Sequence, residues 1–526
     1  MAFVGDGYPL KRISSTPTPD EILSKNGSRG DFTRDEAELA RFGKKQQLKR
    51  RFGMVSVIGL TCTLMITWEA IVSSFQTGLA NGGPGGLIYG YLFAWLGTLL
   101  QALVMGEMGS MIPLAGGYYN WVAILSPPSC SKFLSYLTGW LTVIGYQANI
   151  ASVAFLSGTM IQGLLILNYP DYIFHRWHGT LLFYAIVLVS LFINTWLARL
   201  LPKIEALVLI VHVIGFFCIL IPLVYLAPHG SVQSVFATFS NEGGWSSTGL
   251  AFFIGLSTSM YSFIGSDAAT HMAEEIEDAS TVIPRAMITS VVLNGLLGFG
   301  MLIAVLFCLG DVKLALDSPT GFPFMQVFLT ATGTNEGASL MASVFIAAFI
   351  FATFGYLATA SRMTWAFARE KALPGSTYLA RVEPHTLLPL YSIGLSALIS
   401  LLLALINIGS STAFNALIAI VISAYYSAFS ISAGVLLYKR LTTKPEHMYY
   451  GPFRLGRFGN PIIVLSLLYS IIGTFFSFWP PLVAVTPETM NWSILVFGSV
   501  LTFSIVFWVL YSRKVYTGPI LEIMPS

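Results

Sequence analysis

The chain has 526 residues, of which 55% are hydrophobic and only 10% are charged, and its formal net charge is +3. Soluble globular proteins carry about 25% charged residues. Most of the surface of this protein therefore cannot face water, which excludes a soluble globular fold. The four cysteines lie far apart in the sequence, which excludes a disulfide framework and the ligand spacing of a metal site.

Residues 1–50 form a polar segment rich in Ser, Pro, Lys, Arg, Asp and Glu. This composition predicts a flexible N-terminal tail on the cytoplasmic side of a membrane. The first apolar run begins near Gly53, which is too late in the chain for a cleavable secretory signal.

Twelve apolar runs follow the tail, and each is long enough to cross a bilayer core of about 30 Å as a helix. They cover residues 53–77, 85–111, 133–165, 178–198, 202–227, 248–273, 285–310, 337–364, 387–407, 411–438, 458–480 and 491–512. The third and the eighth run exceed the required length, which predicts that these helices tilt. We therefore expect an all-α integral membrane protein.

The positions of the Lys and Arg residues support this number of spans. With the tail in the cytoplasm, all but two of the 28 basic residues fall in the tail or in cytoplasmic segments, and the exceptions are Arg176 and Lys313. Basic residues near membrane helices gather on the cytoplasmic side, and the loss of one span would reverse the side of every later loop. We expect twelve spans with both termini inside, ending in a cytoplasmic tail over residues 513–526.

Polar residues interrupt the first and the sixth span near their middles. The interruptions are Thr67-Trp68-Glu69 and Ser262-Phe263-Ile264-Gly265-Ser266-Asp267. Small polar residues often serve close helix packing, but broken helices at matching positions of two halves indicate the binding site of a secondary transporter. The spacing predicts two inverted repeats, residues 51–227 and 248–438, followed by two further helices over residues 458–512.

Several short motifs occur in the order found in one transporter group. They are Asn81-Gly-Gly-Pro84, Gly106-Glu-Met108, Ala115-Gly-Gly-Tyr118, Phe263-Ile-Gly-Ser-Asp267, Glu274-Glu275, Pro284-Arg285-Ala286 and Ala360-Ser-Arg-Met363. With these motifs the chain resembles the amino acid–polyamine–organocation superfamily over about residues 50–520, and within it the fungal amino acid/choline permeases. The resemblance implies a five-plus-five inverted-repeat (LeuT-like) fold with broken helices one and six. It also implies a central site between helices one, three, six, eight and ten, and alternating access that is usually driven by protons.

The resemblance also implies a Gly-Ser-Gly motif at the break in helix one, whose backbone N–H groups bind a substrate carboxylate. This chain has Thr67, Trp68 and Glu69 there. Glu69 would repel a carboxylate and attract a cation, and an aromatic face adds about 0.5–2 kcal/mol per cation–π contact. We therefore expect import of a small nitrogenous cation such as choline or ethanolamine. The expected substrate-binding residues are Thr67, Trp68, Glu69, Tyr146, Asn149, Phe263, Gly265 and Asp267.

Other ionisable residues lie inside or beside the spans, where they are costly and therefore functional candidates. His212 lies where the resemblance implies a lysine in helix five of proton-coupled relatives. Because imidazole titrates near pH 6.5, we expect His212 and Glu69 to couple transport to protons; a neutral histidine bonded to a helix carbonyl is the alternative. An inner gate of ion pairs is expected from Glu107, Glu274, Glu275, Arg285 and Arg362, with Arg369 at the same level.

Three other interpretations remain beside a cation symporter. One is an amino acid or GABA permease of the same fold, in which Glu69 binds the ammonium group of the substrate. The alternative role of Trp68 and Phe263 is packing against neighbouring helices. A non-transporting nutrient sensor is another, and a membrane-embedded enzyme is disfavoured because the histidines are scattered. The expected partners are the solute, a proton and the lipid bilayer, with no cofactor, metal or nucleic acid. The expected location is the plasma membrane, or otherwise the vacuolar membrane.

Overall fold

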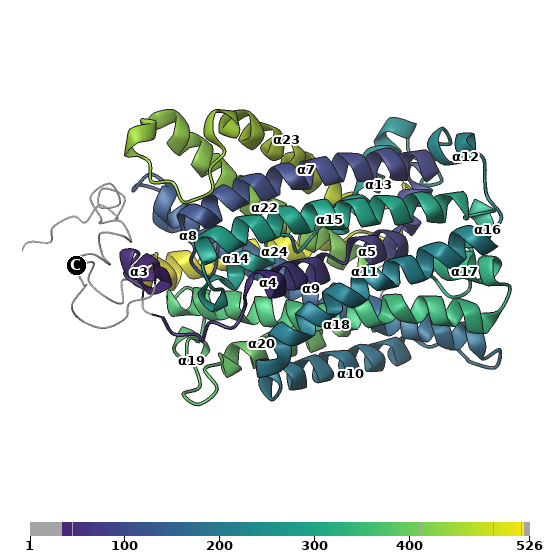
Figure 1. Cartoon of the computed structure of the whole chain (residues 1–526), viewed down its shortest axis with the longest axis horizontal. Coiled ribbons are helices and arrows are strands. Elements are labelled where there is room, and N and C mark those ends of the chain that lie inside the picture. Colours follow the sequence, from purple (N-terminus) through teal and green to yellow (C-terminus); the bar gives the residue numbers. More distant parts are fainter. Residues whose placement is uncertain (1–33, 45, 410–412, 488, 517, 520–526) are drawn as a thin grey trace, which may run out of the picture.

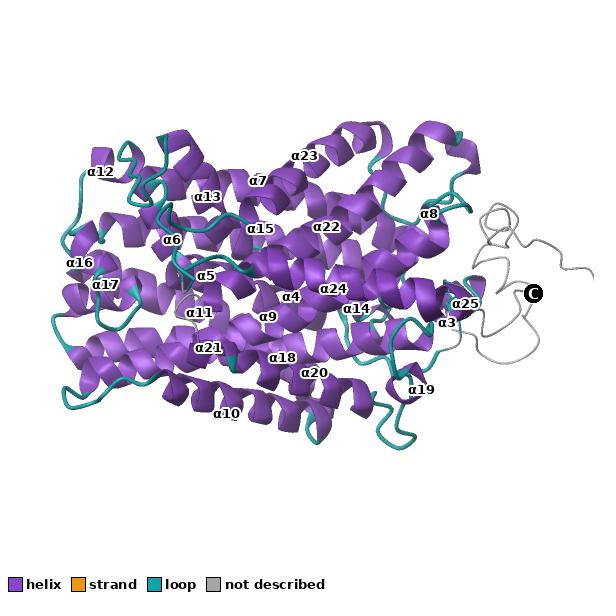
Figure 2. Cartoon of the chain, turned by 180° about the vertical axis from the view of Figure 1, so that it is seen from behind, coloured by secondary structure: helices purple, strands orange, loops and turns teal. Residues whose placement is uncertain are grey.

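The computed structural model of the chain describes residues 34–44, 46–409, 413–487, 489–516 and 518–519. Within these residues the fold consists of helices joined by loops, without a strand (Figure 2). The elements up to the middle of the chain are α3 (Arg34–Arg41), α4 (Met54–Met65), α5 (Thr67–Ser74), α6 (Gln76–Ala80), α7 (Gly83–Met111), α8 (Tyr118–Leu125), α9 (Ser131–Asn168), α10 (Arg176–Thr195), η1 (Ala198–Leu200), α11 (Leu201–Leu226), α12 (Val232–Phe236), α13 (Thr248–Tyr261) and α14 (Ala268–His271). The remaining elements are η2 (Ala273–Glu275), α15 (Ala279–Phe307), α16 (Val312–Leu316), α17 (Pro323–Thr332), α18 (Asn335–Arg369), α19 (Ser376–Leu379), α20 (Leu390–Ala404), α21 (Ile406–Gly409), α22 (Ala413–Thr442), η3 (Pro445–His447), η4 (Gly456–Phe458), α23 (Gly459–Ser477), α24 (Ser493–Phe507), η5 (Trp508–Ser512) and α25 (Arg513–Val515).

The long helices run along the long axis of the molecule (Figure 1). The short helices α3 and α19 lie at one end, which we call the tail side. The short helices α12, α16 and α17 lie at the opposite end, which we call the far side. The helix α9 lies at the centre and packs against α10, α18 and α22, while α7 packs against α15 and α4 against α11.

Eleven helices in the described part of the chain are long and apolar enough to cross a membrane. They confirm the all-α membrane fold, and each corresponds to one of the predicted spans. The predicted span over residues 248–273 is absent from this set, because its helix breaks: α13 has only 14 residues and the four-residue α14 follows after a turn. The division into two inverted repeats stays a prediction.

The first span is broken at Ile66, one residue earlier than predicted. Ile66 has φ 34° and ψ 47°, a left-handed conformation that is strained for a β-branched residue. The sequence suggested that Thr67, Trp68 and Glu69 interrupt the helix. In the structure they form the first turn of α5. The Asn294 side chain on α15 accepts a hydrogen bond from the Thr67 N–H at 3.3 Å. This bond satisfies one of the free N–H groups that a helix start leaves, which explains why the helix resumes there.

The sixth span is broken between Ser262 and Asp267, as predicted. Gly265 has φ +100°, and a Cβ atom there would lie 2.6 Å from the Tyr356 hydroxyl. Glycine is therefore required both for the backbone conformation and for the close approach of α18. The Tyr356 hydroxyl lies 2.7 Å from the Leu64 carbonyl and 3.2 Å from the Ile264 carbonyl, so a single side chain contacts the backbone of both breaks.

The described part of the N-terminal tail packs against the bundle, so the prediction of a flexible segment over residues 1–50 is corrected only for the described residues from Arg34 onward. Residues 1–33 lie outside the described part of the chain. From Arg34 onward the tail packs against the tail side of the bundle: Lys44 is buried and forms an ion pair with Glu370 at the end of α18. The backbone N–H groups of Arg51 and Phe52 donate to the Glu275 carbonyl at 2.9 and 3.0 Å. These partners, which are distant in sequence, explain why composition alone missed the packing.

Candidate functional site

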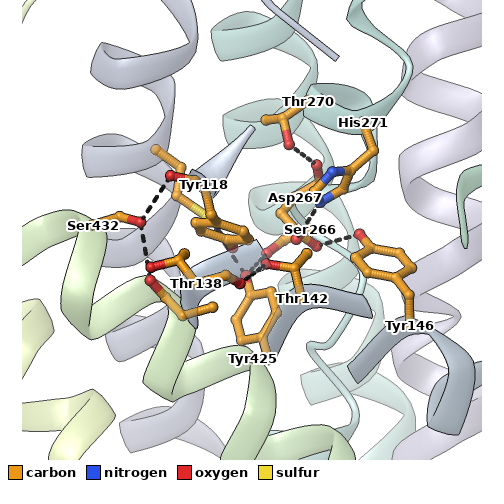
Figure 3. A network of polar contacts seen from close by, with 12 residues as sticks. Tyr118, Thr138, Thr142, Tyr146, Ser266, Asp267, Thr270, His271, Tyr425 and Ser432 are labelled. Atoms are coloured by element: carbon orange, nitrogen blue, oxygen red, sulfur yellow. Dashed lines mark hydrogen bonds and ion pairs between the residues drawn. The ribbon is translucent and has the colours of Figure 1, made fainter. Parts of the chain in front are cut away.

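A buried carboxylate lies at the break in helix six. Asp267 precedes α14 and has no exposed surface. The Tyr146 hydroxyl on α9 donates to its Oδ1 at 2.8 Å, and His271 Nε2 lies 3.2 Å from its Oδ2. Figure 3 shows Tyr146 and His271 pointing toward Asp267 from two sides. Within the described residues no Lys or Arg pairs with Asp267, and its carboxylate oxygens contact the Tyr146 hydroxyl and the His271 imidazole.

Three tyrosines from three helices surround this carboxylate (Figure 3). The rings of Tyr118 on α8 and Tyr425 on α22 lie 6.1 Å apart and almost perpendicular, and the ring of Tyr146 lies 4.7 Å from that of His271. The Tyr425 hydroxyl is 3.0 Å from Ser266 Oγ. We call Tyr118, Tyr146 and Tyr425 the tyrosine cage. Aromatic faces around a carboxylate can accommodate an organic cation.

A small cavity lies inside the cage and has a volume of about 10 Å³. It is lined by Tyr118, Thr142, Gly145, Tyr146, Asn149, Ile264, Asp267, Val421, Tyr425 and Ala428. This volume is close to the minimum that holds one water molecule. A solute of the size of choline therefore fits only if the cage side chains move. One of them is Tyr146, whose hydroxyl donates a hydrogen bond to Asp267.

A larger cavity of about 350 Å³ lies on the far side. Its walls include Ser74 and Gln76 at the end of helix one, Gln162 on α9, and Arg176. It is lined by Phe155, one to two turns beyond Asn149 along α9.

Aromatic side chains lie between the two cavities. The ring of Phe155 stacks on that of Phe414 at 5.6 Å, and Phe414 meets Tyr261 edge-on at 5.9 Å. The Tyr261 hydroxyl lies 2.9 Å from Ser152 Oγ, on the turn of α9 between the cavities. Three rings thus pack together beside the wall of the larger cavity.

A second polar cluster joins helices one and five. Glu69 Oε1 lies 2.7 Å from His212 Nδ1, and both side chains are buried. The Trp68 ring contacts His212, Phe216 and Phe345 at centroid distances of 5.8, 6.1 and 5.1 Å. Within the described residues, Glu69 Oε2, His212 Nε2 and Trp68 Nε1 have no hydrogen-bond partner. Polar atoms buried in this way are candidates for bound water or protons.

The structure does not bring all of the expected substrate-binding residues together, and their roles stay a prediction. Trp68 packs between α11 and α18, and Glu69 contacts His212 rather than the tyrosine cage. The Phe263 ring packs on Tyr91 of α7 at 5.1 Å and does not line the small cavity. A side chain one position before or after a break can point to either side of the helix, and the sequence does not fix that choice. Tyr146, Asn149 and Asp267 do lie together, around the small cavity.

Buried ion pairs lie toward the tail side. Arg362 Nε contacts Glu275 Oε1 at 2.7 Å, and Arg369 contacts Glu274 at 2.6 Å. The structure therefore places four of the predicted gate residues in two pairs.

Two other gate predictions have a different outcome. Glu107 contacts Arg440 of α22 at 2.7 Å rather than one of the predicted gate arginines on α15 and α18. Arg285 is exposed and forms no ion pair within the described residues.

Sequence reasoning missed two residues of the Asp267 environment, Tyr118 and Tyr425, and one gate residue, Arg440. His271 was recognisable as an ionisable residue inside a span, one helical turn after Asp267, and Tyr118 ends a quoted motif. Tyr425 and Arg440 lie in α22 without a distinguishing pattern. Only the packing of α22 against α8 and α9 brings Tyr425 to the site.

The sequence matches the family model described as amino acid permease over residues 52–500. It is 32% identical over 477 residues to the choline transporter of Saccharomyces cerevisiae, covering 89% of this chain and 82% of that protein. It is 30% identical over 511 residues to the amino-acid permease BAT1 of Arabidopsis thaliana, covering 93% of this chain and 97% of that protein. The names of these relatives are those of transporters and permeases, not of enzymes.

Proposed function

Because the chain belongs to the amino acid permease family of multi-pass membrane proteins, we propose that it binds the ammonium group of a small organic solute at Asp267 and carries the solute by alternating access. One observation supports this proposal above the others. Asp267 is a buried carboxylate at a helix break, inside three tyrosines and without a Lys or Arg partner in the described part of the chain. A charge buried in a membrane protein is costly, and a cationic solute would compensate it.

The cage favours a choline-like amine over an amino acid. An amino acid also carries a carboxylate, which needs a cation or free N–H groups. The walls of the small cavity contain no Lys or Arg. Tyrosine faces suit a quaternary ammonium group, at about 0.5–2 kcal/mol per cation–π contact. The name of the yeast relative, a choline transporter, agrees with this substrate; an amino acid such as GABA is the second candidate, in line with the plant relative.

We propose import, and the two ends of the bundle support this direction. The large cavity opens toward the far side, whereas buried ion pairs and the packed tail close the tail side. With the tail in the cytoplasm, this is a conformation that receives solute from outside. Inward opening then requires that the Arg362–Glu275 and Arg369–Glu274 pairs separate, which is the inner gate we propose.

The Glu69–His212 pair is the proposed element of proton coupling. It joins α5, which follows the break in helix one, to α11. A protonated imidazole would hold these helices together by an ion pair, and a neutral one would release them. We therefore propose symport of the solute with protons into the cell, at the plasma membrane.

An uptake experiment tests the substrate and the transport activity together. Cells that lack their own choline and amino acid carriers express the tagged protein and receive labelled choline, ethanolamine or GABA at two external pH values. We expect uptake of choline or ethanolamine that is faster at the lower pH, with the tag at the plasma membrane. Uptake of GABA alone would overturn the cation proposal. A protein that reaches the membrane and takes up none of these solutes would support a sensor instead.

A further inference from the structure

We infer that Glu205, which lies outside the sites described above, binds and releases a proton in each transport cycle. This inference rests on the proposed transport function. Glu205 is the fifth residue of α11 and its residue surface is 1% exposed. In the described part of the chain it is the only buried carboxylate for which neither oxygen has a hydrogen-bond partner.

Within the described residues, an ionised carboxylate in this position would have neither a hydrogen-bond donor nor a cation to stabilise it. Such a charge is strongly unfavourable in an apolar interior. A proton on the carboxyl group removes the charge and leaves a small polar group that the interior tolerates. We therefore assign the neutral, protonated carboxyl group to the conformation that the structure shows.

The carboxyl group lies in a seam between α4, α11 and α18. Gly355 of α18 leaves room for it, because a Cβ atom there would lie 3.1 Å from Glu205 Oε1. Gly59 of α4 lies against the Glu205 backbone, because a Cβ atom on Gly59 would lie 2.6 Å from the Glu205 carbonyl oxygen. Thr63 lies beside the carboxyl group, but its hydroxyl already donates to the Gly59 carbonyl at 2.7 Å. It therefore presents lone pairs, which suit a protonated carboxyl group.

The other ionisable side chains around this seam do not replace the proton. The elements packed against α11 are α4, α15, α17, α18 and η1. Their ionisable residues are Cys62, Arg199, Arg285, Glu336, Tyr356, Arg362 and Arg369, and α11 itself adds Lys203, His212, Cys218 and Tyr225. In the described structure none of them forms an ion pair or a hydrogen bond with Glu205.

The seam is placed where proton release can be coupled to opening of the tail side. The half-helix α4 ends at the left-handed residue Ile66, so it can move separately from α5. When α4 leaves the seam, water from the tail side reaches Glu205, and the carboxyl group gives its proton to that water. The resulting carboxylate must take up a proton before α4 can pack against it again.

His212 stands two helical turns further along the same helix. Their separation of seven positions places Glu205 and His212 on one face of α11, about 10 Å apart along its axis. Both side chains are buried, and His212 lies nearer the far side. The two residues thus form an outer and an inner proton-binding position, with Glu205 as the one from which the proton leaves to the cytoplasm.

Purified protein in liposomes separates proton coupling from solute movement. Exchange of labelled for unlabelled choline requires no net proton transfer, whereas accumulation from a pH gradient does. A gradient of one pH unit supports about tenfold accumulation by a one-proton symporter. We expect Glu205→Gln, which keeps the size of the side chain, to abolish this accumulation while exchange continues. Exchange by the wild-type protein reports on the proposed function itself, and accumulation reports on Glu205.

Matched variants define the outcomes. Glu336→Gln changes an exposed glutamate at the start of α18 and should leave accumulation unchanged. Accumulation by Glu205→Gln equal to that of the wild type would overturn the inference, and so would loss of exchange together with accumulation in a folded protein. If Glu205→Gln does not fold, Glu205→Asp tests the inference instead. It keeps a carboxyl group but places it one methylene group closer to the α11 backbone. A displaced pH profile of accumulation then supports the inference, and an unchanged profile overturns it.

Discussion

The substitution Asp267→Asn tests the proposed cation site most directly. Asparagine has nearly the volume of aspartate, and its Oδ1 can still accept the hydrogen bond that the Tyr146 hydroxyl now donates at 2.8 Å. The tyrosine cage also stays in place, so any cation–π contribution is retained. The variant therefore removes one property of the site, its negative charge.

The magnitude follows from the burial of the carboxylate. Asp267 has no exposed surface, and removal of one partner of a buried charge pair costs about 2–5 kcal/mol of binding free energy. At about 1.4 kcal/mol per factor of ten, the Kd for choline should rise roughly 30- to 4,000-fold. The remaining contacts with Tyr118, Tyr146 and Tyr425 should keep weak binding measurable at high choline concentration.

The assay compares two ligands on two proteins. Binding of labelled choline to the purified protein is measured by equilibrium dialysis, with dimethylbutanol, the uncharged carbon analogue of choline, as competitor. The wild type should prefer choline strongly, and Asp267→Asn should lose most of this preference. Asp317→Asn, at an exposed position on the far side, serves as control. A choline Kd of the variant within about threefold of the wild-type value would refute the reasoning, because a bound ammonium cannot lose a buried counter-charge at so small a cost.

Three further substitutions test how the breaks, the gate and the proton pair are held. Tyr356→Phe removes the hydroxyl that contacts the Leu64 carbonyl at 2.7 Å; a buried acceptor left unpaired costs about 1–3 kcal/mol, so Tm should fall, and an unchanged Tm would show that the contact stabilises nothing. Arg362→Met leaves Glu275 as an uncompensated buried charge and should destabilise the protein by about 3–5 kcal/mol, measured by chemical unfolding. The double variant with Glu275→Gln should recover part of that loss, and no recovery would contradict the pairing. His212→Ala should flatten the pH dependence of uptake, and a wild-type pH profile would exclude His212 from proton coupling.

Much of the fold is determined locally. A bilayer requires about 20 apolar residues per helix, and basic residues mark the cytoplasmic loops. Each span can therefore be predicted from its own local sequence. Eleven described helices between Met54 and Val515 agree with this expectation, and the exception is the sixth span, whose helix breaks. The break at Gly265 was also predictable, because a glycine among polar residues interrupts an apolar run.

The site required the tertiary structure. Tyr118, Tyr146 and Tyr425 come from three helices, and each helix contains other tyrosines that are equally apolar in context. Trp68 and Phe263 flank the breaks as the sequence shows, yet they pack toward neighbouring helices. The direction of a side chain depends on the rotation of its helix about its own axis, which is set by packing against neighbours.

The sequence by itself thus determined that this protein crosses a membrane many times, and that carboxylates lie at or beside two interrupted helices. Only the tertiary structure decided that Asp267 belongs to an aromatic cage, Glu69 to a histidine, and Glu205 to no partner in the described chain. The physical reason is the difference in range. The transfer of a helix into lipid is a sum over its own residues, whereas the state of a buried charge depends on groups hundreds of residues away that folding brings within a few ångströms.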